Sequence, residues 1–195
     1  MDQKEKEIMV PVEISARHIH LNQADQDILF GKEYKLKVSK KLSQGEDFAA
    51  EETVDIEVNE QEIRGVRVVG PVRPETQLEL TLSDSYRLKT DIPVRISGNV
   101  SGTPGFKAVG LAGAVVKKEG MIVAQRHLHI SPEEAEKYGV SNKETVSIVC
   151  GEQRKITFQN VAVRMAKGFK LTLHIDVDEA NTAGLKVCGV GKIAR

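Results

Sequence analysis

The pattern of apolar and polar positions near the start of the chain predicts a strand followed by a short helix. The largely apolar residues 9–14 fit a strand that leads into the residues at 17–21. Asn22 fits a helix N-cap, residues 23–30 fit two helical turns, and Gly31 fits the helix end.

The same order of elements returns in the second half. A strand-like stretch precedes Ser131, which fits an N-cap with Pro132 at the first helical position. Glu134 completes a capping box, and Gly139 ends the predicted helix. Each half therefore contains a strand, a short capped helix and a glycine in the same order.

Short runs with alternating apolar and polar residues fill much of the remaining sequence. The strands expected in the first half are 34–40, 53–58, 62–69, 76–82 and 92–96. Those expected in the second half are 145–149, 154–158, 161–165 and 169–175. Many short strands with glycine-containing turns predict small β-barrels.

An internal duplication relates the two halves. An Arg-His-aliphatic-His-aliphatic motif stands at 17–21 and again at 126–130, an offset of 109 residues (127 − 18 and 129 − 20). A repeat of this length indicates duplicated domains rather than a solenoid. The predicted fold is mainly β, with two tandem small β-barrel domains and short capped helices. The expected boundaries are residues 1–97, a glycine-rich linker at 98–114, and residues 115–195.

Charge and composition narrow the function. The 28 basic and 28 acidic residues balance, which argues against binding nucleic acid through bulk charge. Aromatic residues make up 4% of the chain and Trp is absent, so a stacking surface for single strands is not expected. An anionic small molecule remains compatible, because it needs only a local group of cations.

Cysteine usage and the N-terminus predict a soluble cytoplasmic protein. Cys150 and Cys188 are isolated, which fits a reducing compartment and small buried side chains. Residues 1–7 are charged and resemble neither a signal peptide nor a membrane anchor. No run approaches the roughly 18 apolar residues of a membrane span.

The histidines provide the strongest chemical signal. The chain has five, of which four form the pairs His18/His20 and His127/His129, and the fifth is His174. Side chains two apart on a strand point to the same face, so each pair could hold one zinc ion. The alternative is a set of ordinary histidines in a barrel wall or on a surface.

A metal held by two histidines needs further ligands. His174 lies in a strand-like run and would complete a three-histidine site with His127 and His129. In the first half Glu79 would complete a site with His18 and His20, although a carboxylate there could also be a solvated outward residue. Thr81 faces the same side, but a hydroxyl is a poor zinc ligand.

Three more residues have functional and ordinary interpretations. Arg73 follows a Gly-Pro turn and is the residue type suited to bidentate phosphate binding, but composition alone favours a surface arginine. Asp176 and Asp178 could accept hydrogen bonds from metal-bound imidazoles, or could belong to a turn.

Five stretches resemble the phosphate propanoyltransferase family, the phosphotransacylases associated with bacterial microcompartments. They extend over nearly the whole chain, from residue 10 to about residue 189. They are Ser15-Ala16-Arg17-His18-Ile19-His20-Leu21, Phe48-Ala49-Ala50-Glu51-Glu52-Thr53-Val54, Gly70-Pro71-Val72-Arg73 with Thr76-Gln77-Leu78-Glu79, Arg126-His127-Leu128-His129, and His174-Ile175-Asp176-Val177-Asp178-Glu179-Ala180-Asn181.

The resemblance implies a fold, a reaction and a site. The fold is two β-barrel domains with a dinuclear zinc site between them. The reaction is acyl-CoA plus phosphate giving acyl phosphate plus CoA, reversibly, with propanoyl or acetyl as the acyl group and propanediol degradation as one setting. One zinc would be bound by His18, His20 and Glu79, and the other by the three remaining histidines. Arg73 matches the family's phosphate-binding arginine.

The resemblance also implies coenzyme A contacts. They fall on Ser15, Lys40, Arg67, Val69, His174 and Asn181. The sequence differs from the family at Thr81, where a relative has a cysteine metal ligand. Residues 1–7 are short for the amphipathic helix that targets microcompartment members, so a free cytoplasmic enzyme is expected. The sequence leaves the oligomeric state open, a homo-oligomer included.

Two other functions fit the same residues. A zinc-dependent hydrolase would use the metals to activate water and would need no phosphate acceptor. A non-catalytic, metal-stabilised β-barrel would need closed four-ligand sites, whereas each predicted set has three good ligands. Neither cysteine lies near the metal motifs in sequence, so direct transfer is expected rather than an acyl-enzyme.

Overall fold

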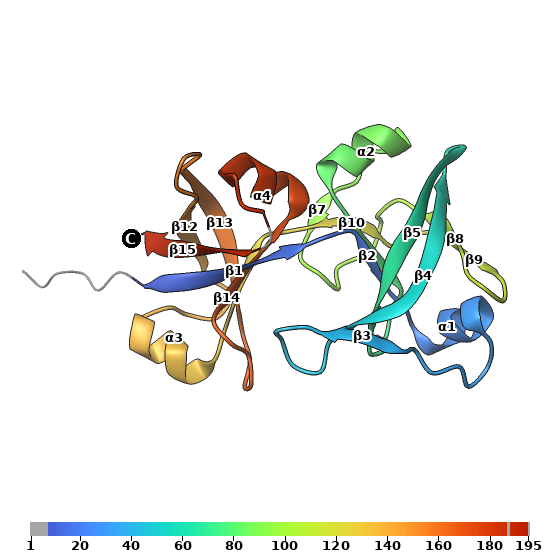
Figure 1. Cartoon of the computed structure of the whole chain (residues 1–195), viewed down its shortest axis with the longest axis horizontal. Coiled ribbons are helices and arrows are strands. Elements are labelled where there is room, and N and C mark those ends of the chain that lie inside the picture. The colour runs from blue at the N-terminus through green and yellow to red at the C-terminus, as the bar shows by residue number, and fades with distance from the viewer. Residues whose placement is uncertain (1–7, 187, 195) are drawn as a thin grey trace, which may run out of the picture. The chain divides into compact units, whose positions relative to one another are not determined.

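The computed structural model describes residues 8–186 and 188–194, with the backbone alone of Cys188. The expectation about residues 1–7 lies outside this part of the chain. The protein forms two compact units (Figure 1). We call them the barrel unit, Met1–Ser15 with Gln125–Arg195, and the sheet unit, Ala16–Ala124.

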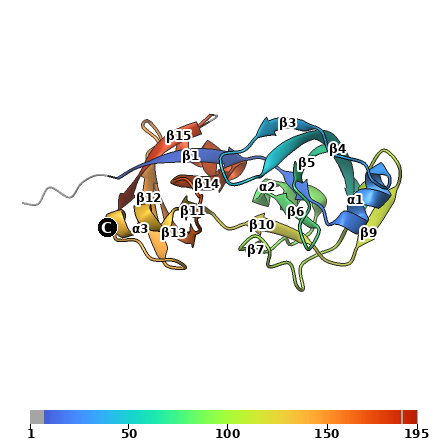
Figure 2. The same cartoon turned by 90° about the horizontal axis from the view of Figure 1, so that it is seen from below.

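The barrel unit contains a closed barrel in the order β1-β14-β11-β13-β12-β15. Its strands are β1 (Met9–Ser15), β11 (His127–Ile130), β12 (Thr145–Cys150), β13 (Ile156–Met165), β14 (Thr172–Asp176) and β15 (Cys188–Ala194). Its helices are α3 (Pro132–Tyr138) and α4 (Val177–Ala183). Figure 2 shows β1 alongside β15, with which it pairs antiparallel, and β1 also pairs parallel with β14.

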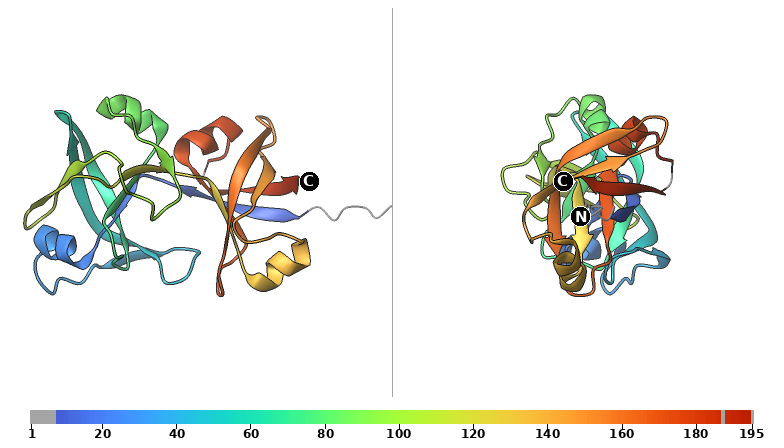
Figure 3. Two further views of the ribbon diagram at one scale, coloured as in Figure 1. Left: turned by 180° about the vertical axis from the view of Figure 1, so that it is seen from behind. Right: turned by 90° about the vertical axis from the view of Figure 1, so that its left-hand side faces the viewer.

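The sheet unit contains a nine-stranded sheet in the order β7-β10-β6-β2-β5-β4-β8-β9, with β3 paired to β4. Its strands are β2 (His18–His20), β3 (Val38–Lys41), β4 (Phe48–Val58), β5 (Gln61–Gly70), β6 (Gln77–Leu80), β7 (Val94–Arg95), β8 (Phe106–Val109), β9 (Ala114–Lys117) and β10 (Met121–Ala124). Its helices are α1 (Gln23–Phe30) and α2 (Leu82–Leu88). Figure 3 shows the long antiparallel β4–β5 hairpin from behind.

Each unit has its own hydrophobic core. The alternating positions of the strands supply it, since Val54, Ile56 and Val66 are buried in the sheet unit and Val10, Val12 and Leu173 in the barrel unit. The mainly β fold with short capped helices is therefore confirmed. The barrel closes in one unit, and the other unit has a larger sheet that runs from β7 to β9.

The units divide the chain at positions other than 1–97, 98–114 and 115–195. The first strand belongs with the second half of the chain, because Val10 and Val12 are buried in the barrel core and β1 closes the barrel between β14 and β15. The expected linker instead contains β8, which pairs with β4.

Several of the glycines that suggested a linker serve close backbone contacts. A Cβ at Gly105 would lie 2.3 Å from the Lys117 carbonyl oxygen, and one at Gly110 would lie 2.5 Å from that of Leu29. Glycine is required where backbones approach this closely. These residues are therefore packed inside the sheet unit.

The duplicated motif has the same surroundings in both units. β2 pairs parallel with β5 and antiparallel with β6. β11 likewise pairs parallel with β13 and antiparallel with β14.

Among the described residues no helix is both long and apolar enough to cross a membrane.

Candidate active site

The sheet-unit cluster consists of His18, His20 and Glu79. The two histidines lie on β2, and Glu79 lies opposite His18 on the antiparallel neighbour β6. The His18 and His20 Nε2 atoms are 3.1 Å apart. Glu79 places one carboxylate oxygen 3.6 Å from His18 Nε2 and the other 3.8 Å from His20 Nε2. The three groups predicted from sequence therefore converge on one point.

Backbone carbonyls set the protonation of both imidazoles. His18 Nδ1 lies 2.8 Å from the Ala16 carbonyl oxygen, and His20 Nδ1 lies 3.1 Å from that of Val69. A carbonyl oxygen only accepts, so each Nδ1 donates a hydrogen, and in a neutral imidazole Nε2 then presents its lone pair. This grouping of two Nε2 atoms and a carboxylate suits a cation bound between them.

A metal ion fits this requirement better than a proton. Burial, followed by the nearby His18 and Arg73, lowers the pKa of His20 to about 3, so this imidazole is neutral near pH 7. Zinc bound at about 2.1 Å to tetrahedral ligands separates neighbouring ligand atoms by roughly 3.4 Å. The observed separations of 3.1–3.8 Å bracket that value.

Arg73 contributes a positive charge beside this cluster. Its backbone N–H donates to the Leu21 carbonyl (2.8 Å), which ties the turn after β5 to the end of β2. Its guanidinium donates to Asp47 Oδ2 at 3.1 Å and to Ser97 Oγ at 3.4 Å. The side chain is 32% exposed, so an anion can reach it.

Ser97 and Gln77 are functional candidates that the sequence interpretation missed. Ser97 Oγ donates to Glu79 Oε1 (2.9 Å), and Gln77 Nε2 donates to the same oxygen (2.6 Å). Ser97 thereby links Arg73 to the metal-type carboxylate. Gln77 was detectable, because it is two residues from Glu79 on the same strand face. Ser97 was predicted only as the last residue of the first domain, and no local sequence pattern indicated a role for it in the site.

The barrel-unit cluster consists of His127, His129 and His174. β11 places the first two, and β14 places His174 opposite His127. One ligand atom from each lies within 4.8 Å of the others. His127 Nδ1 lies 2.9 Å from the Gln125 carbonyl oxygen, which repeats the arrangement at His18. This second set was also predicted in full.

Glu13 belongs beside His174 and was not predicted. It pairs with His174 across β1 and β14, and its Oε2 lies 3.7 Å from His174 Nε2. A carboxylate in this position can orient a metal-binding imidazole. The available signal was an acidic residue inside an apolar strand, the same signal that identified Glu79.

Helix capping accounts for two of the residues with open interpretations. The Asp176 side chain accepts from the Glu179 N–H at the start of α4 (2.8 Å), which selects the turn interpretation. Thr81 caps α2 in the same way, with its hydroxyl accepting from the Asp84 N–H (3.3 Å). The Thr81 hydroxyl is therefore engaged in a capping box.

The predicted coenzyme A contacts are divided between the units. Ser15, His174 and Asn181 lie in the barrel unit, and Lys40, Arg67 and Val69 lie in the sheet unit. Arg67 donates to the Ala50 and Glu51 carbonyls (3.0 and 2.7 Å). The Val69 carbonyl orients His20. Their role in binding CoA remains a prediction.

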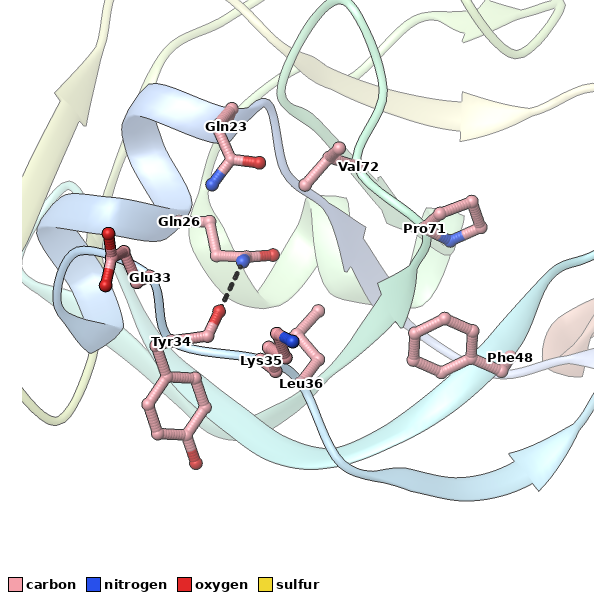
Figure 4. A pocket seen from close by; sticks show the side chains of 9 residues that line it. All are labelled: Gln23, Gln26, Glu33, Tyr34, Lys35, Leu36, Phe48, Pro71 and Val72. Atoms are coloured by element: carbon pink, nitrogen blue, oxygen red, sulfur yellow. Dashed lines mark hydrogen bonds between the residues drawn. The ribbon is translucent and has the colours of Figure 1, made fainter.

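A cavity of about 700 Å³ lies elsewhere in the sheet unit (Figure 4). None of the predicted site residues lines it. The Gln26 amide spans part of its wall and donates to the Tyr34 carbonyl (3.0 Å). The lining residues are Gln23, Gln26, Glu33, Tyr34, Lys35, Leu36, Phe48, Pro71 and Val72.

The fold and the site together define a class of protein. It is a mainly β protein with a metal-type ligand set in each unit, one of them beside a guanidinium suited to an anion. A model of the phosphate propanoyltransferase family matches residues 11–186. The chain belongs to this family of acyltransferases.

Individual relatives agree with the family match. A phosphate propanoyltransferase of Thermotoga maritima is 44% identical over 181 residues, which cover 92% of this chain and 86% of the relative. One of Clostridioides difficile is 41% identical over 190 residues, 97% of this chain and 91% of the relative. One of Lachnoclostridium phytofermentans is 43% identical over 181 residues, 92% and 84% of the two chains.

Proposed function

We propose that this protein transfers a propanoyl group reversibly between coenzyme A and inorganic phosphate. Its relatives are named for this reaction. The observation that supports it most directly is the hydrogen-bonded connection from Arg73 through Ser97 to Glu79. It joins an anion-binding guanidinium to a buried metal-type ligand set in the same unit.

We propose zinc as the cofactor, with one ion in each cluster. His18, His20 and Glu79 would bind one ion, and His127, His129 and His174 the other. Imidazole and carboxylate sets with three protein ligands are typical of catalytic zinc. A bound zinc would supply Lewis-acid stabilisation of negative charge on oxygen.

Arg73 has the main role in handling phosphate. Its guanidinium would exchange the Asp47 contact for two phosphate oxygens and hold them in a fixed orientation. A third phosphate oxygen then attacks the thioester carbonyl carbon, and the C–S bond breaks with its electron pair on sulfur. The products are acyl phosphate and CoA thiolate, which takes a proton. The Ser97 hydroxyl would keep the Arg73 guanidinium and the Glu79 carboxylate in fixed positions during the reaction.

Direct transfer is supported by the state of Cys150. This thiol is buried in β12, and burial raises its pKa to about 11, so it is a poor nucleophile near pH 7. Initial-rate plots at varied substrate concentrations should therefore intersect, as for a ternary complex. Parallel lines would indicate an acyl-enzyme instead.

We propose Ser15, Lys40, Arg67, Val69, His174 and Asn181 as coenzyme A contacts. Lys40 and Arg67 are exposed cations, suited to the phosphates of CoA. We also propose a cytoplasmic location, because a buried free thiol such as Cys150 fits a reducing compartment.

The deciding experiment follows thiol release from propanoyl-CoA with and without phosphate. Release that requires phosphate, with acyl phosphate as the second product, is the expected result. Release without phosphate would assign the protein to the hydrolases, since the same ligand sets could activate water. No release from propanoyl-CoA or a short panel of acyl-CoAs would leave a non-catalytic protein.

A further inference from the structure

The arginine directly before the first histidine of each motif forms an ion pair with a carboxylate. Arg17 NH2 lies 3.0 Å from Asp84 Oδ1 in the sheet unit. Arg126 NH1 lies 2.6 Å from Glu179 Oε1 in the barrel unit. The metal ligands themselves do not require either arginine, so its presence in both motifs needs a separate explanation.

Each carboxylate occupies the same position in a capped helix. Asp84 is the third residue of α2, and its other oxygen accepts from the Thr81 N–H (3.3 Å). Glu179 is the third residue of α4, and its other oxygen accepts from the Asp176 N–H (3.2 Å). One oxygen thus closes the capping box and the other binds the arginine.

These helices follow the strands that supply the third ligands. Glu79 precedes Asp84 by five residues (84 − 79), and His174 precedes Glu179 by five (179 − 174). The third ligand also faces the first histidine in both ladders, as His18↔Glu79 and His127↔His174. Each ion pair therefore links the residue before the first histidine's strand to the helix after the third ligand's strand. These two strands must stay aligned for the ligands to converge.

The same arginine lies inside the backbone turn that orients the first histidine. His18 Nδ1 faces the Ala16 carbonyl, and His127 Nδ1 faces that of Gln125. In the sequence, Arg17 and Arg126 are therefore the single residues between each histidine and the residue whose carbonyl it contacts. We propose that Arg17–Asp84 and Arg126–Glu179 are positioning ion pairs that keep each first histidine aimed at its metal. This inference rests on the proposed metal sites.

The two copies of the motif differ in their ligands and acids but share the arginine–carboxylate ion pair. The third ligand is Glu79 in one and His174 in the other, and the acid is Asp in one and Glu in the other. The ion pair persists through these changes. Asp84 is also only 3% exposed, so its carboxylate is largely removed from water and Arg17 supplies compensating charge.

Arg126 has contacts that Arg17 lacks among the described residues. Its Nε donates to the Gln159 carbonyl (2.8 Å), and its guanidinium lies 5.5 Å from the centre of the Phe158 ring. Lysine can replace a single charge contact but not this planar arrangement. Arg17→Lys should therefore preserve metal binding, whereas Arg126→Lys should preserve it only in part.

The test measures zinc affinity in full-length single-site proteins. His129→Ala leaves the sheet-unit cluster to be measured alone, and His20→Ala leaves the barrel-unit cluster. Adding Arg17→Met to the first background should weaken zinc binding 10- to 100-fold, about the cost of losing a partner behind a metal ligand. Added to the second background, the same change should leave affinity unaltered. Arg126→Met should give the reciprocal result.

Asp84→Asn and Glu179→Gln supply second variants that keep an oxygen for the capping box while removing the charge. Each should weaken its own site to a similar degree, and Arg17→Met with Asp84→Asn should cost no more than either alone. When cobalt replaces zinc, each variant should change the visible absorption spectrum of the cobalt ion at its own site, relative to the same protein without that variant. Arg64→Met removes an exposed ion pair with Glu62 in the same unit and should change neither site.

The outcomes separate this inference from the proposed function. Wild-type affinity and an unchanged cobalt spectrum in both Arg17→Met and Asp84→Asn would overturn the positioning role alone. Equal weakening of both sites by Arg17→Met would also overturn it, because that result indicates general destabilisation. Failure of the unsubstituted protein to bind either ion would overturn both the zinc sites and their positioning.

Discussion

Arg73 is the residue whose surroundings most favour phosphate chemistry. It lies close enough to His20 to lower the pKa of that imidazole, and its guanidinium contacts Asp47 and Ser97. Asp47 contacts one side of the guanidinium. A phosphate dianion would compete well for this position, because it offers more charge and bidentate geometry.

Replacing Arg73 with Ala should reduce the phosphate-dependent rate. The expected loss is about 2–4 kcal/mol of transition-state stabilisation, as for a removed charge-stabilising donor. Steady-state rates over a range of phosphate concentrations measure it. Arg64→Ala, which removes an exposed arginine of β5, is the matched control and should retain the rate. Full activity in Arg73→Ala would disprove the role in phosphate binding.

Cys150 should react slowly with thiol reagents in the folded protein. Burial raises its pKa from 9.0 to about 11, so at pH 8 roughly one thiol in a thousand is ionised. Labelling of a Cys188→Ser variant isolates this thiol. The rate should rise only as the pH approaches 11, or on unfolding. Rapid labelling at pH 8 would contradict the burial and reopen the acyl-cysteine route.

At the scale of elements, capped helices hold the ends of the ligand-bearing strands. α1 follows β2, α2 follows β6, α3 follows β11 and α4 follows β14. Each begins with a side chain that accepts a hydrogen bond from the first turn of the helix. The chain thereby leaves each strand at a defined point soon after the last metal-type ligand.

The Thr81 cap should contribute measurably to stability. Thr81 is 4% exposed, and its hydroxyl is engaged in the α2 capping box. Thr81→Ala should lower the free energy of unfolding by about 1 kcal/mol. Urea unfolding of the metal-free protein measures this. Tyr86→Ala, on the exposed face of α2 at 85% exposure, should change stability by less than about 0.5 kcal/mol.

At the scale of the whole molecule, each unit has its own core and its own ligand set. The buried clusters of the two units share no residues, and each histidine set lies inside one unit. We therefore expect the two proposed metal sites to load separately.

Metal content should follow this independence. The unsubstituted protein should contain two zinc ions per chain, His20→Ala one, His129→Ala one, and the double variant none, because a site with two remaining ligands is weak. Elemental analysis after dialysis measures the ratio. A chelator should abolish transfer activity, and added zinc should restore it. Loss of both ions in either single variant would contradict independent loading.

Much of the site was visible in the sequence because its signals are local. His-x-His spacing on a strand, an acidic residue within an apolar strand, and the capping residues Asn22 and Ser131 each depend on neighbours within a few positions. They predicted both ligand sets, α1, α3 and the internal duplication. The missed helices α2 and α4 have the same capping signals, at Thr81 and Asp176, but these residues lie within or next to the strands predicted at 76–82 and 169–175.

Only the tertiary structure decided which distant segments meet. β1 lies far in sequence from β14 and β15, yet it closes their barrel, because Val10 and Val12 complete that core and the strand occupies the gap between them. Ser97 reaches Glu79, and Glu13 reaches His174, through chain paths that no local pattern describes. The sequence by itself predicted the two sets of candidate metal ligands and their spacing, since these depend on strand geometry alone. Long-range pairing decided the partners that orient them.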